Sequence, residues 1–385
     1  MGVMLSSIMI FYRISRYGAV NTLIHKNILS SLLYLAYLLL GFASFGWSTD
    51  PGFSALQWLM IVQSMIFAYY FIKSLALLDI YFPDHRIRLY HMLGNTVFIL
   101  ILIFVIGLFI SPDIFFRLTN GGEEARLGGY IMNPNELGML CGVGIACLIF
   151  DIRERNKWWT ILKIIVLIYA LYMTGSRSSL IGALLIILFH IVQSNNKKLK
   201  IVIISAVLII SPVAINKIIF KNGDSSRMEE VMSMTGRLPF WTALINEGLP
   251  REPLLGFGFM RIDYKEFFQS THTYPGKMTH NTFIQVLMSL GFIGLTIIVF
   301  HLFFAVKAFL REKRERKLMI FGIFIPILIN SFTEFGMFGE SNYGILFYQL
   351  LLFTVSFKSR TFLTTVQKNI LSRKRPDLIA PINKA

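Results

Sequence analysis

Residues 280–296 read HNTFIQVLMSLGFIGLT, and this stretch decides how the rest of the chain is interpreted. His280 stands near the end of a polar segment, and the apolar run that follows continues to about Leu310. An imidazole just before the start of a membrane helix is either an interfacial spacer or a proton acceptor, and these residues alone leave both interpretations open. Gly291 and Gly294 are three residues apart, and small residues at this spacing predict that a neighbouring helix approaches closely.

The composition indicates a membrane protein. The chain is 55% hydrophobic and has a mean hydropathy of +0.62. Apolar runs long enough to cross a bilayer recur from end to end, so we predict an all-α polytopic membrane protein with about 10–12 transmembrane helices and one larger external loop. The predicted spans are residues 28–47, 55–72, 92–111, 136–150, 158–174, 178–193, 201–220, 282–310, 318–338 and 342–357, with a weaker eleventh at 1–12. No cleavable signal peptide is predicted, because no small-residue cleavage site follows an isolated apolar core.

Basic residues occupy alternate connections between these spans. Six connections hold 24 of the 37 Lys and Arg residues, namely residues 13–27, 73–91, 151–157, 193–200, 311–317 and 358–385. Because basic loops stay in the cytoplasm, this asymmetry predicts that the 221–280 segment is extracytoplasmic. The formal net charge of +16 is therefore a topology signal, and nothing resembles a nucleic-acid-binding module.

This map divides the chain into four parts. Residues 1–220 form the N-terminal transmembrane helices, 221–280 the external loop, 281–357 the C-terminal transmembrane helices and 358–385 a cytoplasmic tail. The external loop is too short for a separate domain of ordinary size, so we expect it to cap the membrane bundle.

Cysteine usage and motif content predict no metal site. Cys141 and Cys147 fall within one predicted span, where small apolar fillers are a better interpretation than a disulfide or metal ligands. No HExxH, CxxC or carboxylate cluster is found in the sequence, so we predict no metal and no cofactor.

Two arginines at predicted outer boundaries are candidates for binding an anion. Arg126 belongs to the 112–135 connection, where paired glycines and Asn133-Pro134-Asn135 mark a structured turn. Arg177 lies between two apolar runs that are joined almost without a linker, and a guanidinium there needs a partner. Arginine binds phosphate oxygens in a bidentate way, so a diphosphate is the expected ligand. A solvated loop at Arg126 and lipid headgroups at Arg177 are the alternatives.

Further candidates lie in and after the external loop. Arg237 stands just ahead of a helix that Pro239 is expected to start and Gly248 to end, which favours an anion at its N-terminus. Trp241 could pack on a sugar face or anchor at the interface. Glu334 lies near the outer end of an otherwise apolar helix, where a carboxylate needs an arginine or a substrate hydroxyl.

These motifs together resemble the bacterial O-antigen ligase and O-antigen polymerase superfamily, over about residues 115–340. The resemblance rests on His280-Asn281 followed after nine residues by Gly-x-x-Gly, on Gly175-Ser176-Arg177, on Gly236-Arg237 with Trp241, on Pro253…Gly256-x-Gly258, and on Arg126…Asn133-Pro134-Asn135. Residues 1–27 give one doubtful span where such proteins usually have more.

The resemblance implies a GT-C-like helical fold and a glycosyltransferase in the cytoplasmic (inner) membrane with its active site on the extracytoplasmic face. The donor would be a glycan on undecaprenyl diphosphate, and the acceptor lipid A core for a ligase or another lipid-linked glycan for a polymerase. Neither reaction is expected to need a nucleotide or a metal. The acceptor, the sugar and the linkage stay open, and a protein acceptor is a third alternative.

Both the chemistry and the resemblance assign roles to the candidates. His280 would accept the proton of the acceptor hydroxyl, and Glu334 is a second candidate base or an orienter of an arginine. Arg177 and Arg237, with Arg126 as a third candidate, would neutralise the diphosphate. Direct displacement predicts inversion at the anomeric carbon. The substrate-binding candidates also include Trp241 and Asn281.

The competing hypothesis is a polytopic transporter or lipid-linked glycan flippase. Such proteins place ionisable groups at mid-bilayer in broken helices, often in two related halves. Here the notable groups gather at the predicted outer face and no internal repeat is found, which favours the transferase.

Overall fold

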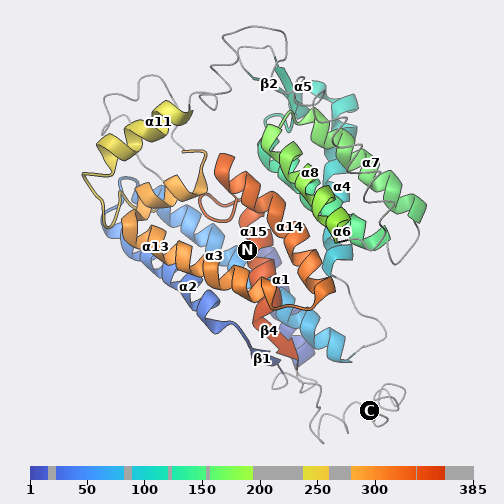
Figure 1. Cartoon of the computed structure of the whole chain (residues 1–385), viewed down its shortest axis with the longest axis horizontal. Coiled ribbons are helices and arrows are strands. Elements are labelled where there is room, and N and C mark those ends of the chain that lie inside the picture. Colours follow the sequence, from blue (N-terminus) through green and yellow to red (C-terminus); the bar gives the residue numbers. More distant parts are fainter. Residues whose placement is uncertain are drawn as a thin grey trace, which may run out of the picture.

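The computed structural model describes residues 1–15, 23–81, 89–119, 124–152, 157–193, 237–259, 279–334 and 336–359. The predicted span 201–220, most of the external loop 221–280 and the tail beyond residue 359 lie outside these ranges. In the described part, helices stand side by side in a bundle whose two sides are joined by α14 (Arg314–Thr333) (Figure 1).

The helices follow the predicted spans. They are α1 (Gly2–Ser15), α2 (Ile28–Ala43), α3 (Pro51–Tyr81), α4 (Leu89–Ile110), α6 (Pro134–Ile152), α7 (Lys157–Met173), α8 (Arg177–Val192), α13 (Thr282–Leu310), α14 and α15 (Tyr343–Ser356). Within the described ranges, α2 with its 3-10 extension to Gly46, α3, α4, α13 and α14 are long and apolar enough to cross a membrane, and the other five are shorter apolar helices. This confirms an all-α polytopic membrane protein.

The weakest predicted span, 1–12, forms α1. This helix packs against α3, where the rings of Phe11 and Tyr70 lie 5.2 Å apart and the ammonium of Lys73 lies 4.8 Å from the Phe11 ring centroid. The first residues are therefore part of the helical bundle.

Helix α14 lies between two groups of helices. It packs against α6 and α8 on one side and against α13 and α15 on the other. A β-carbon on Gly142 or Gly182 would lie 3.3 or 3.5 Å from Pro326 of α14, so these two glycines allow close contact. Small residues thus bring the end of α14, which carries Glu334, next to the start of α6.

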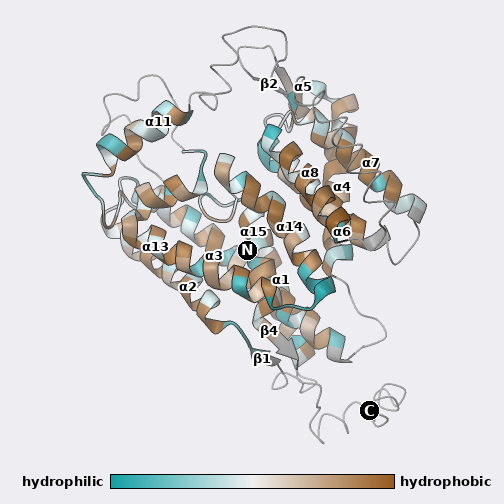
Figure 2. Ribbon diagram, in the orientation of Figure 1, coloured by the Kyte–Doolittle hydropathy of each residue, from teal (hydrophilic) through white to brown (hydrophobic). Residues whose placement is uncertain are grey.

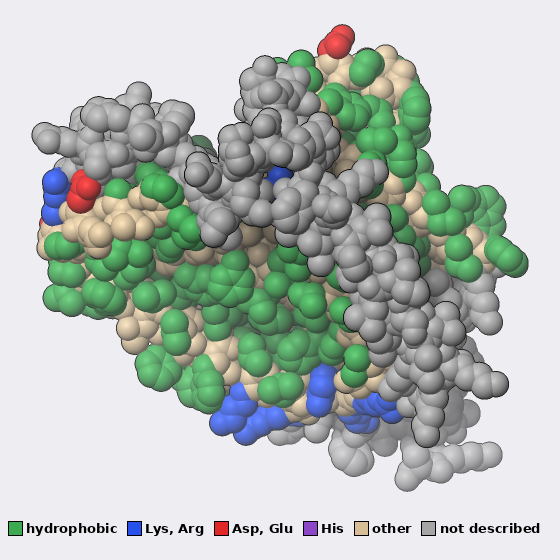
Figure 3. Space-filling view, turned by 45° about the horizontal axis from the view of Figure 1, so that its top comes forward, with side chains coloured by type: hydrophobic (Ala, Val, Ile, Leu, Met, Phe, Trp, Pro, Cys, Tyr) green, Lys and Arg blue, Asp and Glu red, His purple; other side chains and the backbone are tan. Residues whose placement is uncertain are grey.

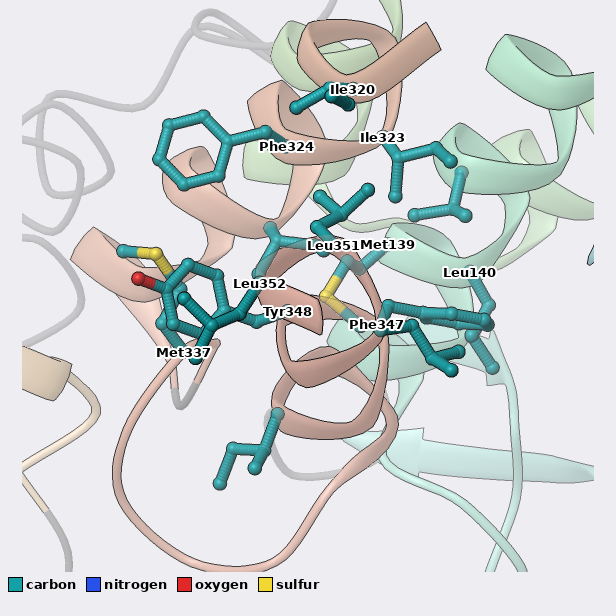
Figure 4. Packing of buried hydrophobic residues seen from close by; sticks show 14 of the residues in the cluster. Met139, Leu140, Ile320, Ile323, Phe324, Met337, Phe347, Tyr348, Leu351 and Leu352 are labelled. Carbon is teal, nitrogen blue, oxygen red and sulfur yellow. The ribbon is translucent and has the colours of Figure 1, made fainter. Parts of the chain in front are cut away.

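The main hydrophobic core extends through most of the bundle, and Figure 4 shows the part where α6, α14 and α15 meet. Met139 of α6, Ile323 of α14 and Leu351 of α15 are each at most 1% exposed there. Cys141 and Cys147 are free and buried, in agreement with their expected role as apolar fillers. Apolar residues dominate the helices along their length in Figure 2.

Helix α13 is interrupted at Gly291, whose backbone has φ 63°. The loop segment 253–258 lies against the interruption. Four backbone groups of α13 that would otherwise form two helical hydrogen bonds bond to the backbone of this segment instead. The two N–H groups donate to it, as Phe292 N–Pro253 O (2.8 Å) and Ile293 N–Leu254 O (3.2 Å). The two carbonyls accept from it, as Phe257 N–Met288 O (3.0 Å) and Gly258 N–Ser289 O (2.9 Å). A β-carbon on Gly291 would lie 2.2 Å from Leu254 O, so only glycine fits.

This arrangement corrects one prediction. We expected Gly291 and Gly294 to admit a neighbouring helix, but a loop backbone contacts Gly291, and a β-carbon on Gly294 would meet Leu290 of its own helix. Small residues at this spacing predict that another backbone comes close to the helix, but they do not predict whether that backbone is a helix or a loop.

Two short β-ladders supplement the helices in the described part. Strand β1 (Leu23–His25) pairs antiparallel with β4 (Phe357–Ser359), and β2 (Phe116–Thr119) pairs with β3 (Glu124–Leu127). The β2–β3 hairpin, preceded by the short helix α5 (Pro112–Phe115), carries Arg126. The structured turn predicted for the 112–135 connection is therefore present.

The described surface has a broad hydrophobic band, with Lys and Arg side chains gathered along its lower edge in Figure 3. Basic side chains bounding an apolar band are typical of a membrane-spanning bundle.

Candidate active site

Glu334 lies at the centre of a polar cluster at the end of α14, for which it is the C-cap residue. Its side chain is 7% exposed. Oε1 accepts hydrogen bonds from Arg237 Nη2 at 2.9 Å and Asn135 Nδ2 at 2.7 Å, and Oε2 lies 2.7 Å from His280 Nδ1. We call these four residues, with Arg126 that binds Asn135, the Glu334 cluster.

The environment of Glu334 favours its ionised form. Burial alone would raise the pKa of this carboxyl, but the hydrogen bond and charge of His280, the charge of Arg237 and the amide of Asn135 outweigh burial and hold the pKa below its usual range. The carboxylate is therefore charged at neutral pH and serves as an acceptor for each of its partners.

His280 is held in an unusual backbone conformation just before α13. Its φ is 50°, a left-handed value that costs a residue other than glycine about 1–2 kcal/mol. The side chain is 23% exposed, with Nδ1 turned to Glu334. A carboxylate that accepts from Nδ1–H places the lone pair of the neutral ring on Nε2, which is the arrangement a general base requires.

Neighbouring residues fix this turn. Asn281 is the N-cap of α13; its Oδ1 accepts from Phe283 N at 2.9 Å and Ile284 N at 3.1 Å. Trp241 Nε1 donates to Thr279 O at 2.7 Å. Both predicted substrate-binding residues thus hold the backbone on either side of His280.

Arg126 and Asn135 extend the cluster to the other group of helices. Arg126 Nη2 donates to Asn135 Oδ1 at 2.7 Å, and Arg126 Nε donates to Thr174 O at 2.8 Å. A β-carbon on Gly175, which has φ 61°, would lie 3.3 Å from Arg126 Nε. The Gly-Ser-Arg turn therefore lies directly against Arg126.

The other two predicted arginines differ in their contacts. Arg237 is the first residue of α11 (Arg237–Ala243), which continues as a π-helix to Gly248, the predicted end. Its Nη1 donates to Thr333 O at 2.5 Å, in addition to the ion pair with Glu334. Arg177 begins α8 and is exposed, and within the described ranges no hydrogen bond or ion pair holds its guanidinium.

The hydroxyls beside Arg177 bond within the protein. Ser176 Oγ lies 2.8 Å from Ser179 Oγ, and Ser179 Oγ donates to Asn135 O at 3.1 Å. These hydroxyls thus tie the start of α8 to the start of α6.

The structure thus brings His280, Glu334, Arg126 and Arg237 into one cluster, with Trp241 and Asn281 as supports and Arg177 at the adjoining turn. Sequence reasoning missed Asn135, which had been noted only as part of a turn. Its position directly after Asn-Pro is ordinary turn composition and gives no signal of the contact with Glu334. Among the described residues, no group of three or more His, Cys, Asp or Glu side chains is placed to hold a metal ion.

Two comparisons with known proteins agree on the family. Residues 162–299, which include Arg177, Arg237 and His280, match the family model described as O-antigen ligase. The chain is also 25% identical over 230 residues to the ComP-specific O-oligosaccharyltransferase of Acinetobacter baylyi. That match covers 56% of this chain and 41% of the relative, so the chain spans about two fifths of the relative's length. Both matches therefore make this chain similar to O-antigen ligases and to an O-oligosaccharyltransferase over the residues compared.

Proposed function

We propose that the protein moves an oligosaccharide from undecaprenyl diphosphate to an acceptor hydroxyl at the extracytoplasmic face of the cytoplasmic membrane. The observation that carries the proposal is the 2.7 Å contact between His280 Nδ1 and Glu334 Oε2, with Arg237 on the other carboxylate oxygen and Arg126 one hydrogen bond further away, on Asn135. A histidine oriented by a carboxylate and surrounded by positive charge suits transfer to a hydroxyl from an anionic leaving group.

In the proposed reaction, His280 Nε2 takes the proton of the acceptor hydroxyl. The acceptor oxygen then bonds to the anomeric carbon while the bond from that carbon to the diphosphate oxygen breaks. Glu334 keeps the imidazole oriented and stabilises the imidazolium that forms, as the third member of a nucleophile–base–orienter set does elsewhere. Attack opposite the leaving group inverts the anomeric centre.

The departing undecaprenyl diphosphate gains negative charge, which the arginines neutralise. Arg177 is exposed, and its guanidinium is the first choice for a bidentate contact with the diphosphate. Arg126 and Arg237 have fixed positions in the Glu334 cluster and contribute a preorganised positive field beside it. The scheme uses no metal and no nucleotide.

Three acceptor classes carry a suitable hydroxyl. They are lipid A core in lipopolysaccharide ligation, another lipid-linked repeat unit in O-antigen, capsule or exopolysaccharide polymerisation, and a protein side chain. The name of the relative describes transfer of an oligosaccharide to oxygen, which supports the reaction type for this chain.

The test is transfer by purified full-length protein in nanodiscs. An undecaprenyl-diphosphate-linked oligosaccharide is supplied with each acceptor class in parallel, and both acceptor mass and released undecaprenyl diphosphate are measured. We expect a product with one acceptor class and none with the His280→Ala variant. Movement of intact donor across the membrane, without cleavage, would instead support the transporter or flippase alternative.

The proposed face of the membrane is tested by labelling. Single cysteines replace Glu252 or Glu315, both exposed, in a background with Cys141 and Cys147 changed to Ala. In cells with a permeabilised outer envelope, an impermeant maleimide should label the cysteine at 252, and the one at 315 only after lysis. The reverse pattern would place the Glu334 cluster on the cytoplasmic side.

A further inference from the structure

Asn135 lies in the first turn of α6, across the Glu334 cluster from His280. Its backbone is anchored independently of its side chain: Asn135 N donates to Asn133 Oδ1 at 2.9 Å, and Asn135 O accepts from Ser179 Oγ at 3.1 Å. The carboxamide therefore extends into the cluster from a fixed base.

The carboxamide can bind its two partners in one orientation only. A guanidinium only donates hydrogen bonds and an ionised carboxylate only accepts them, so Oδ1 faces Arg126 and Nδ2 faces Glu334. Asp at this position would lack the donor, and Ala would lack both groups. The two contacts thus require the chemistry of an amide.

This amide is one of two donors that orient the Glu334 carboxylate toward His280. Oε1 receives two donors, Asn135 Nδ2 at 2.7 Å and Arg237 Nη2 at 2.9 Å, and these fix the carboxylate with Oε2 turned to His280. Asn135 also stands between Arg126 and Glu334. A second guanidinium in direct contact with the carboxylate would compete with His280 for it.

We infer that Asn135 is a positioning residue: it holds the Glu334 carboxylate in the orientation that serves His280 and keeps Arg126 one hydrogen bond away from it. The inference rests on the proposed function, because the role of Asn135 is to support the base in that reaction. Asn135 acts through Glu334 and does not need to touch substrate.

A double-mutant cycle tests this role. The kcat and donor KM of Asn135→Ala, Glu334→Gln and the double variant are compared with wild type in nanodiscs. A small misplacement of a catalytic group can cost about 10²-fold, so we expect Asn135→Ala to lower kcat by roughly tenfold to a hundredfold with a smaller change in KM. In the Glu334→Gln background, Asn135→Ala should have little further effect. Independent losses that multiply in the double variant would show a merely structural role and overturn the inference.

Two further variants keep the test decisive. Asn135→Asp preserves the shape and the bond to Arg126 but faces Glu334 with a like charge, so it should lose at least as much kcat as Asn135→Ala. Asn133→Ala removes one of the two backbone anchors of Asn135 but leaves its carboxamide and the Ser179 anchor in place, so it should lose clearly less kcat than Asn135→Ala. An equal loss in Asn133→Ala would assign the effect to the helix start and contradict the inference.

The outcomes separate the two proposals. If wild type transfers glycan, His280→Ala does not, and both Asn135 variants match wild type, the positioning role fails while the proposed function stands. If His280→Ala is as fast as wild type, the proposed function itself fails.

Discussion

Two histidines on one stretch of chain occupy opposite kinds of surroundings. His280 precedes α13 and belongs to the Glu334 cluster, with a carboxylate 2.7 Å away and a side chain 23% exposed. His301 lies inside α13 and is fully buried. Its Nδ1 lies 2.8 Å from Ser30 O, and its Nε2 lies 2.6 Å from Tyr348 Oη.

The described groups that contact His301 are uncharged. Gln349 Nε2 donates to Tyr34 Oη at 2.9 Å, and the Tyr34 ring lies 5.3 Å from the His301 ring. We call His301, Ser30, Tyr34, Tyr348 and Gln349 the His301 cluster. It joins α2, α13 and α15 through polar contacts inside the bundle.

The difference shows what turns an imidazole into a candidate base. Both side chains are hydrogen-bonded and both are held by several helices. Only His280 combines a charged orienting partner with access from outside, and a base needs both. The His301 cluster has the polar groups of a site but neither charge nor access, so we assign it to packing specificity.

The largest expected effect is on activity. Loss of a general base typically costs about 10² to 10⁴ in rate, so His280→Ala should nearly abolish transfer while the protein still inserts and remains monodisperse. His301→Leu, as matched control, should keep the specific activity of the folded fraction. Transfer assays in nanodiscs, normalised to folded protein, compare the two, and equal losses would remove the contrast between the clusters.

The next effect concerns the leaving group. A hydrogen bond to a charged group contributes about 1.5–3 kcal/mol, so Arg177→Ala should reduce kcat/KM by roughly tenfold to a hundredfold. Arg177→Lys keeps the charge but loses the planar fork and should recover only part of the activity. Competition by undecaprenyl diphosphate measures the same contact without turnover. Unchanged inhibition in Arg177→Ala would exclude this arginine from diphosphate binding.

A smaller effect is expected on stability. Hydrogen bonds between transmembrane helices contribute about 1 kcal/mol, so Tyr348→Phe, which removes the partner of His301 Nε2, should lower the free energy of unfolding by about that amount. Transfer rate should stay at the wild-type value. Detergent-induced unfolding monitors the first quantity, and a fall in rate larger than the fall in folded protein would give the His301 cluster a catalytic role.

The smallest effect is the pH dependence of stability from Glu334. Its pKa is lowered in the folded state, so the ionised carboxylate adds stability that is present above its ordinary value of 4.5 and is lost as pH falls through the lowered pKa. The charged groups that face Glu334 are His280, Arg237 and, with the opposite sign, Glu136. The stability advantage of wild type over Glu334→Gln should therefore shrink as the pH falls below about 5. An advantage that grows on acidification would contradict the lowered pKa.

Hydropathy predicted most of the described helices because it records which residues leave water. The predicted span 282–310 coincides with α13, and 92–111 lies within three residues of α4 at each end. The predicted span 55–72 is too short at both ends, since α3 runs from Pro51 to Tyr81. Its last turns include Lys73 and Asp79, and polar residues end an apolar window although they do not end a helix.

Site residues could be predicted from the sequence where the chemistry of a side chain requires a particular kind of partner. A carboxylate at a membrane boundary needs a cation, and Glu334 indeed pairs with Arg237. Asn135 was not predictable, because an asparagine after Asn-Pro is ordinary turn composition and its partner Glu334 is 199 residues away. The role of Gly291 was also missed, since the loop that contacts it leaves no pattern in α13 itself.

The interruption of α13 has a consequence for biogenesis. Gly291 lies nine residues beyond Thr282, about 14 Å into the helix. In lipid, each unsatisfied backbone group costs several kcal/mol, and four such groups of α13 find their partners only in residues 253–258. Those residues are synthesised before α13, so the order in which the ribosome produces the two segments matches the order in which the hydrogen bonds are needed. We therefore expect α13 to complete its backbone hydrogen bonds only after residues 253–258 have reached their place beside it.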